Sequence, residues 1–133
     1  MHQIVSLKIE GSSGWTLGLN KVSIGKMDFT PKARNAKLDS GTNMMIFGKQ
    51  DYKYIVDELC DYIAHSRTNM TCIGQFESVG SARPVQITGA TRDAIMAMPH
   101  IKLQFDSYNF DVRPELYCDF VPIVEKNDTK NET

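Results

Sequence analysis

Four consecutive residues, Asp39-Ser40-Gly41-Thr42, carry the groups in this sequence that are best suited to chemistry. Asp39 supplies a carboxylate, Ser40 and Thr42 supply hydroxyls, and Gly41 lets the backbone come close enough to present an N–H. Both flanks are apolar, and a carboxylate between buried strands is costly to ionise unless hydrogen-bond donors surround it. The pattern therefore suits a buried, hydrogen-bonded aspartate. The same residue types also make ordinary surface turns, so both interpretations stand.

The three cysteines allow either a disulfide or free thiols. Cys60, Cys72 and Cys118 form no Cys-x-x-Cys pair and no metal-ligand spacing with the three histidines, so we expect no metal site. One disulfide with one cysteine left over is typical of an oxidising compartment, whereas three free thiols fit the cytosol almost as well.

Three sequons match the acceptor pattern for N-glycosylation. They begin at Asn69, Asn127 and Asn131, and each has threonine two residues later. Seven asparagines and 18 serines and threonines in 133 residues make about one such match expected by chance. The excess favours a secreted or luminal protein.

The composition excludes several classes of protein. Fifteen basic residues against 16 acidic ones leave no surplus of positive charge for binding nucleic acid. No apolar run approaches the roughly 20 residues of a membrane span. The N-terminal segment MHQIVSLKIEG lacks the basic start and apolar stretch of a secretion signal, so an exported protein would carry its signal upstream. An apolar content of 41% is enough for one core.

Alternating apolar residues predict strands in three places. Residues 3–9 alternate loosely, and residues 15–24, from Trp15, predict a strand or hairpin with one buried face that turns at Gly25-Lys26. Residues 101–112 alternate on both sides of Asp106-Ser107, which predicts a β-hairpin. The last residues, 119–133, form a polar tail.

One helix is expected from about Lys49, because a single apolar stripe recurs at helical spacing. The stripe consists of Tyr52, Ile55, Val56, Leu59 and Ile63, and Asp51 lies on the polar side. Residues 73–98 show no clear period and receive no assignment. The expected class is mostly β with one short helix.

Several of these segments together resemble the C-terminal lobe of pepsin- and cathepsin D-like aspartic proteases. In that family, a strand with tryptophan and a glycine turn precedes an Asp-[ST]-Gly-[ST] turn, which is followed by a short helix and later by a hairpin with flanking prolines and a tyrosine. The match covers residues 15–60 and 99–118 in the same order, and its later part contains Pro99, Pro114 and Tyr117.

The resemblance implies roles for the residues of the motif. Asp39 matches the second-lobe catalytic aspartate, Ser40 matches a residue that bridges the two active-site loops, and Thr42 matches the hydroxyl beside the outer carboxylate oxygen. Gly41 supports the turn, and Asn43 is a candidate substrate contact. The implied activity is hydrolysis of a polypeptide by water held between two aspartates, with no cofactor.

Departures from the family pattern imply an incomplete lobe over residues 1–133. The first-lobe Asp-Thr-Gly motif and the closing apolar-Gly-Asp strand are absent, and Lys37 replaces an aliphatic residue. The resemblance implies a Cys72–Cys118 lobe disulfide, with Cys60–Cys72 as the competing pair. We therefore expect a fragment that needs an N-terminal lobe as its partner and is inactive and unstable alone.

Two alternative functions remain. A noncatalytic pepsin-like binding module would keep the fold without turnover. A retroviral-type protease also uses one Asp-[ST]-Gly per chain and works as a homodimer, although that family commonly has alanine where Thr42 stands. For the pepsin-like function, the expected location is outside the cell or in a lysosomal or vacuolar lumen.

Overall fold

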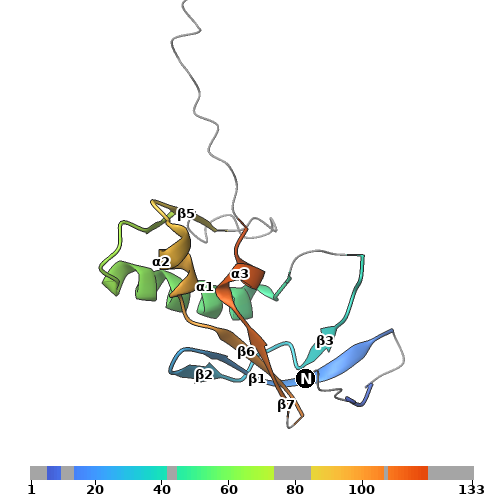
Figure 1. Ribbon diagram of the computed structural model, residues 1–133. Helices are drawn as coiled ribbons and strands as arrows, with labels where there is room; N and C mark the ends of the chain where they lie inside the picture. Colours follow the sequence, from blue (N-terminus) through green and yellow to red (C-terminus); the bar gives the residue numbers. More distant parts are fainter. Residues whose placement is uncertain (1–5, 10–13, 42–44, 74–84, 107, 120–133) are drawn as a thin grey trace, which may run out of the picture.

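A five-stranded antiparallel sheet forms the larger part of the fold, and the helices lie together on one side of it (Figure 1). The computed structural model describes residues 6–9, 14–41, 45–73, 85–106 and 108–119. Within them the chain is mostly β, as the sequence predicts, although three helices are present where one was expected.

The longest strand, β1 (Thr16–Ile24), pairs with three others. A turn at Gly25, which has a φ of 58°, leads into β2 (Met27–Phe29), and β3 (Asn35–Lys37) pairs with the start of β1. Glycine suits this turn because a positive φ is strained for other residues. The strand and turn predicted over residues 15–26 are thus confirmed.

A hairpin of β6 (Ile101–Phe105) and β7 (Tyr108–Val112) completes the sheet in the order β2-β1-β6-β7. The two strands pair from Ile101 with Val112 to Phe105 with Tyr108. Asp106 has a φ of 52°, and its carbonyl accepts a hydrogen bond from the side-chain amide of Asn20 at 3.1 Å. The predicted hairpin is confirmed.

Helix α1 (Lys49–His65) packs against the sheet, and its start matches the prediction. Ile55 joins the core that β1, β6 and β7 share, whereas Ile63 belongs to a second cluster. The main core contains Leu17, Leu19, Val22, Ile24, Ile55, Ile101, Phe105 and Val112.

Asp51 was expected on the solvent-exposed polar side of helix α1, but it is buried. Its side chain is only 2% exposed. Its two carboxylate oxygens accept the backbone N–H groups of Lys32 at 2.8 Å and Ala33 at 3.0 Å. The carboxylate is buried because it fastens α1 to the loop that leads into β3.

The second cluster lies around the C-terminal half of α1. Ile63, Met70, Ile95 and Met98 form its buried centre. Around it lie a two-stranded sheet of β4 (Thr71–Ile73) and β5 (Gln86–Thr88) and the short helices α2 (Arg92–Met96) and α3 (Pro114–Tyr117). Thr91 caps α2 by accepting the Ala94 N–H at 3.2 Å. Within residues 73–98, where the sequence shows no period, the structure therefore contains β5 and α2.

Two further expectations differ from the structure. Residues 6–9 form no strand, and residues 3–5 lie outside the described part of the chain. Trp15 is 65% exposed and does not lie on the buried face.

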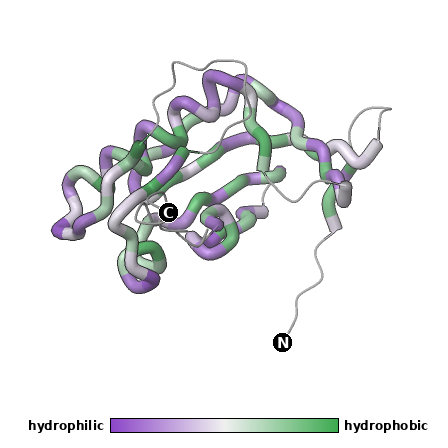
Figure 2. The backbone as a smooth tube through the Cα atoms, turned by 90° about the horizontal axis from the view of Figure 1, so that it is seen from above, coloured by the Kyte–Doolittle hydropathy of each residue, from purple (hydrophilic) through white to green (hydrophobic). Residues whose placement is uncertain are grey.

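Hydrophobic and hydrophilic residues alternate over short stretches (Figure 2). In the described ranges no helix has the length and apolar character needed to cross a membrane.

The buried carboxylate of Asp51 gives the first testable prediction. Asp51→Ala leaves two backbone N–H groups without their acceptor, so we expect the free energy of unfolding to fall by about 1–3 kcal/mol. Urea denaturation measures the change. The matched control is Asp57→Ala on the same helix, where the ion pair with Lys53 is exposed and the expected loss is about 0–1 kcal/mol. Equal losses in the two variants would contradict the assigned role.

Candidate functional site

The turn that contains Asp39 lies at the end of β3. The first residues of β1 pair with β3, and the N–H of Leu38 donates to the carbonyl of Trp15 at 2.8 Å. This bond extends the pairing by one residue beyond β3. The chain therefore enters the Asp39 turn from a fixed strand end, beside the start of β1.

Asp39 is held by the turn itself. Its Oδ1 accepts the backbone N–H of Gly41 at 2.8 Å, and a Cβ added to Gly41 would lie 3.1 Å from the same oxygen. A glycine therefore lets the backbone approach the carboxylate without a steric conflict, as the sequence predicts.

The expectation that Asp39 is buried between strands is wrong for this chain. Asp39, Ser40 and Gly41 are all exposed, which agrees with the surface-turn interpretation. The reason is that β3 is only three residues long and lies against β1 alone, so no described element covers the turn. Thr42 and Asn43 lie outside the described residues.

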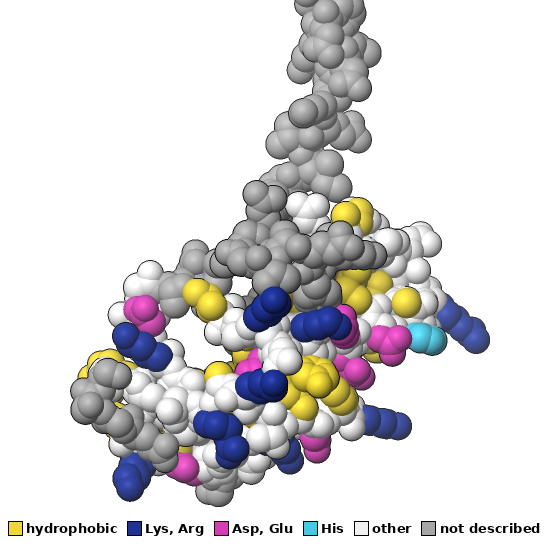
Figure 3. Space-filling model, turned by 180° about the vertical axis from the view of Figure 1, so that it is seen from behind, with side chains coloured by type: hydrophobic (Ala, Val, Ile, Leu, Met, Phe, Trp, Pro, Cys, Tyr) yellow, Lys and Arg dark blue, Asp and Glu magenta, His cyan; other side chains and the backbone are white. Residues whose placement is uncertain are grey.

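Leu38 directly precedes Asp39 and donates its N–H to the carbonyl of Trp15, and Ile46 follows seven residues after Asp39. Trp15 is 65% exposed, Leu38 is 56% exposed and Ile46 is 69% exposed. On the face shown in Figure 3, hydrophobic side chains reach the surface in several places among basic and acidic ones. Single exposed apolar residues are ordinary, and only Leu38 and Trp15 of these three are shown to lie at the strand end that leads into the turn.

Two surface hollows lie elsewhere on the described chain. One is at the N-terminal end of α1, with Lys32, Gly48 and Asp51 in its lining. The other lies between α1 and the β1–β2 turn, with Glu58 and Pro99 in its lining. Asp39 lines neither hollow, so neither of them is a cleft around its carboxylate.

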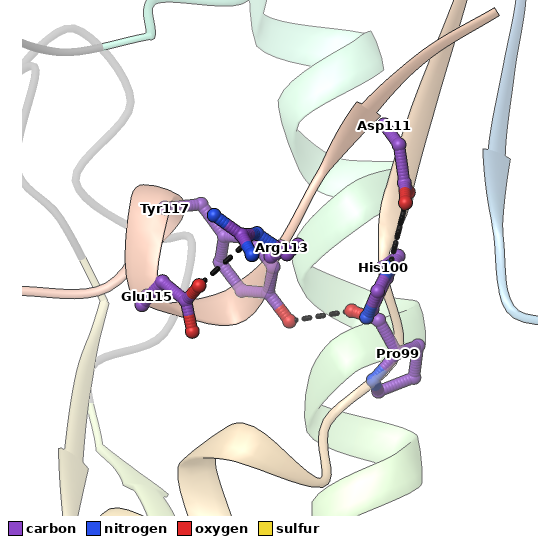
Figure 4. A network of polar contacts seen from close by, with 6 residues as sticks. All are labelled: Pro99, His100, Asp111, Arg113, Glu115 and Tyr117. Carbon is purple, nitrogen blue, oxygen red and sulfur yellow. Dashed lines mark hydrogen bonds and ion pairs between the residues drawn. The ribbon is translucent and has the colours of Figure 1, made fainter. Parts of the chain in front are cut away.

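A polar network joins the hairpin to α3 (Figure 4). His100 Nδ1 contacts the Asp111 carboxylate at 2.9 Å across β6 and β7, and the Tyr117 hydroxyl donates to the Pro99 carbonyl at 2.7 Å. Burial, followed by the nearby Cys118 and Tyr62, raises the pKa of Tyr117 well above its usual value. Tyr117 therefore remains a protonated donor and fixes α3 against Pro99, which lies two residues before β6.

The structure shows which two cysteines form a disulfide. Cys60 and Cys72 form the disulfide, with their Cα atoms 5.8 Å apart, and Cys118 is free. The Cys72–Cys118 pairing implied by the family resemblance is therefore wrong, and the competing pairing is correct. Cys118 packs against the second cluster, where burial and then the charge of Asp119 raise the pKa of its thiol.

The remaining candidate residues have separate positions. Asn69 is exposed in the loop between α1 and β4, whereas Asn127 and Asn131 lie outside the described residues. In the part of the chain that the structure describes, no three His, Cys, Asp or Glu side chains are grouped so that they could hold a metal ion. Sequence reasoning missed the buried role of Asp51, for which no local signal exists.

Comparisons with protein-family models, curated proteins and solved structures found no match for this chain. The resemblance to pepsin-like lobes therefore rests on the residues and motifs quoted for it. The hydrogen bond of Asp39 and the contact between Tyr117 and Pro99 lie within the resembling segments and do not test the resemblance.

The disulfide gives the second testable prediction. Cys72→Ser opens a loop between residues separated by 12 positions, so we expect the free energy of unfolding to fall by roughly 3 kcal/mol. Cys60→Ser is expected to cost as much, and Cys118→Ser is the matched control with a clearly smaller loss. Urea denaturation without reductant measures all three. If Cys60→Ser left the free energy of unfolding unchanged while Cys118→Ser lowered it, the result would instead favour the Cys72–Cys118 pairing.

Proposed function

We propose that this chain supplies one of the two catalytic aspartates of a pepsin-like aspartic endopeptidase, as all or part of the C-terminal lobe. The observation that carries the proposal is the exposed Asp39 turn, in which Gly41 donates its backbone N–H to the carboxylate at 2.8 Å. The turn holds the carboxylate in one orientation and leaves it open to a substrate or to a second carboxylate.

The proposed reaction needs a pair of carboxylates. Two carboxylates about 3 Å apart cannot both ionise, so they share one proton. The ionised member takes a proton from water, and the water oxygen bonds to the peptide carbonyl carbon while the other member protonates the carbonyl oxygen. The C–N bond then breaks as the nitrogen gains a proton. Because the sequence contains a single Asp-[ST]-Gly, the second aspartate comes from another segment or chain.

The exposure of the turn is compatible with this arrangement. A second lobe over Asp39 would also cover the exposed apolar side chain of Leu38 and the neighbouring Trp15, and burial of apolar surface stabilises such contacts by roughly 25 cal/mol per Å². An extended polypeptide substrate would then lie between the two lobes. The antiparallel sheet, followed by a helix after the Asp39 turn, agrees with the order of elements that the proposal requires.

An acidic lumen or the cell exterior is the proposed location of this activity. The Cys60–Cys72 disulfide supports an oxidising compartment, and the three sequons point the same way.

The third prediction concerns the assembled enzyme, that is, this chain together with the polypeptide that carries the second aspartate. We expect Asp39→Asn to lower kcat/KM on denatured haemoglobin at about pH 4 by a factor of roughly 100 or more, because an amide cannot share the acidic proton. The matched control is Asp28→Asn, an exposed aspartate on β2 that pairs loosely with Lys21 at 3.7 Å. A variant at Asp39 that keeps full activity would contradict the proposal and favour a noncatalytic binding module.

The fourth prediction concerns the purified chain alone. We expect no pepstatin-sensitive cleavage at about pH 4, because one carboxylate cannot be both the ionised base and the protonated partner. The assay is repeated over a range of chain concentrations with Asp39→Asn as the control. Cleavage that rises with the square of the concentration and disappears in this variant would instead identify a homodimer with one aspartate from each chain.

A further inference from the structure

Asn69, in the loop before β4, and Thr71, the first residue of β4, both lie at the surface. Both residues are exposed, whereas Met70 between them is 5% exposed and belongs to the second cluster. Met70 is thus turned into the cluster, while the residues on either side of it reach the surface. We propose that Asn69 is an N-glycosylation site of this protein, with the exposed Asn69-Met70-Thr71 sequon as the acceptor.

The backbone of Asn69 lies closely against Gly89. Gly89, which follows β5 with a φ of 69°, lies so close to the Asn69 carbonyl that an added Cβ would collide with its oxygen. The preceding loop is held by Thr68, whose hydroxyl accepts the Met70 N–H at 3.3 Å and contacts Ser66 Oγ at 2.7 Å. The side-chain amide of Asn69 thus projects from a fixed backbone.

The position leaves room for a bulky group. Figure 1 shows the segment between α1 and β4 at the end of α1 that lies away from the large sheet. A branched sugar chain there would not obstruct the pairing of β1, β6 and β7. Ile73 follows Thr71 on the same outer face and is 46% exposed, so the glycan would extend over apolar surface and increase solubility.

The modification is a group transfer with a lipid-linked oligosaccharide diphosphate as the donor. The bond between the first sugar carbon and the phosphate oxygen breaks, and the same carbon bonds to Asn69 Nδ2. The amide nitrogen loses one proton and the lipid diphosphate leaves. The transferring enzyme recognises the hydroxyl residue two positions after the asparagine, which is Thr71 here, and acts in the lumen of the secretory pathway. The Cys60–Cys72 disulfide is stable in the same compartment.

The fifth prediction tests this site in the full chain, expressed in eukaryotic cells behind a secretion leader. Asn127 and Asn131 are both changed to Gln, so that only one sequon remains, and a reporter sequon in the tag confirms entry into the lumen. We expect the chain to carry a glycan at Asn69 that peptide:N-glycosidase removes, with conversion of Asn69 to Asp detected by peptide mass spectrometry. Total cellular chain is analysed, so poor folding or secretion does not hide the result.

Four variants separate acceptor chemistry from local structure. Asn69→Gln and Thr71→Ala should lose the glycan, whereas Thr71→Ser should keep it because serine retains the hydroxyl. Thr88→Ala, which changes the cross-strand neighbour of Thr71 outside the sequon, is the matched control and should keep it. An unmodified Asn69 in chains whose reporter sequon is glycosylated would overturn the proposal. The result does not depend on Asp39, so it stands apart from the proposed peptidase activity.

Discussion

The pairing of β1 is the constraint on which the rest of the structure depends. Three other strands bond to this one strand, and its inward residues are Leu17, Leu19, Val22 and Ile24. A strict period of two would turn Val22 and Ile24 outward. The pairing with β6 shifts register between Leu19 and Lys21, and this bulge restores the inward direction for the second half of the strand. One irregular residue therefore lets both halves of β1 face one core.

The position of Asp39 follows from this strand and from one buried carboxylate. The start of β1 fixes β3, and Asp51 fixes the loop before β3 to the N-terminal turn of α1. The turn containing Asp39 therefore lies between two anchored elements, although nothing in the described chain covers it. The anchoring of β3 by β1 and by Asp51 fixes where the turn lies, whereas its exposure is what an ordinary surface turn shows.

The sequence predicts elements whose signal is local and misses features that depend on distant partners. The strand 16–24, the hairpin 101–112 and the helix from Lys49 each carry a period long enough to recognise. Elements β5 and α2 are too short to show one. Asp51 looks like a solvated helix residue because its two N–H partners lie 18 and 19 positions away. Likewise, no local pattern indicates whether Trp15 or Asp39 is covered, since exposure depends on what packs against them.

The raised pKa of Cys118 explains how this free thiol coexists with the disulfide. Cys72 and Cys118 pack against the same cluster, so the free thiol lies in the same part of the fold as the Cys60–Cys72 bond. Exchange requires the thiolate, and burial together with the charge of Asp119 raises the pKa of Cys118. The thiol therefore remains protonated to a higher pH. At acidic pH the thiolate fraction is smaller still, so exchange with this disulfide slows further.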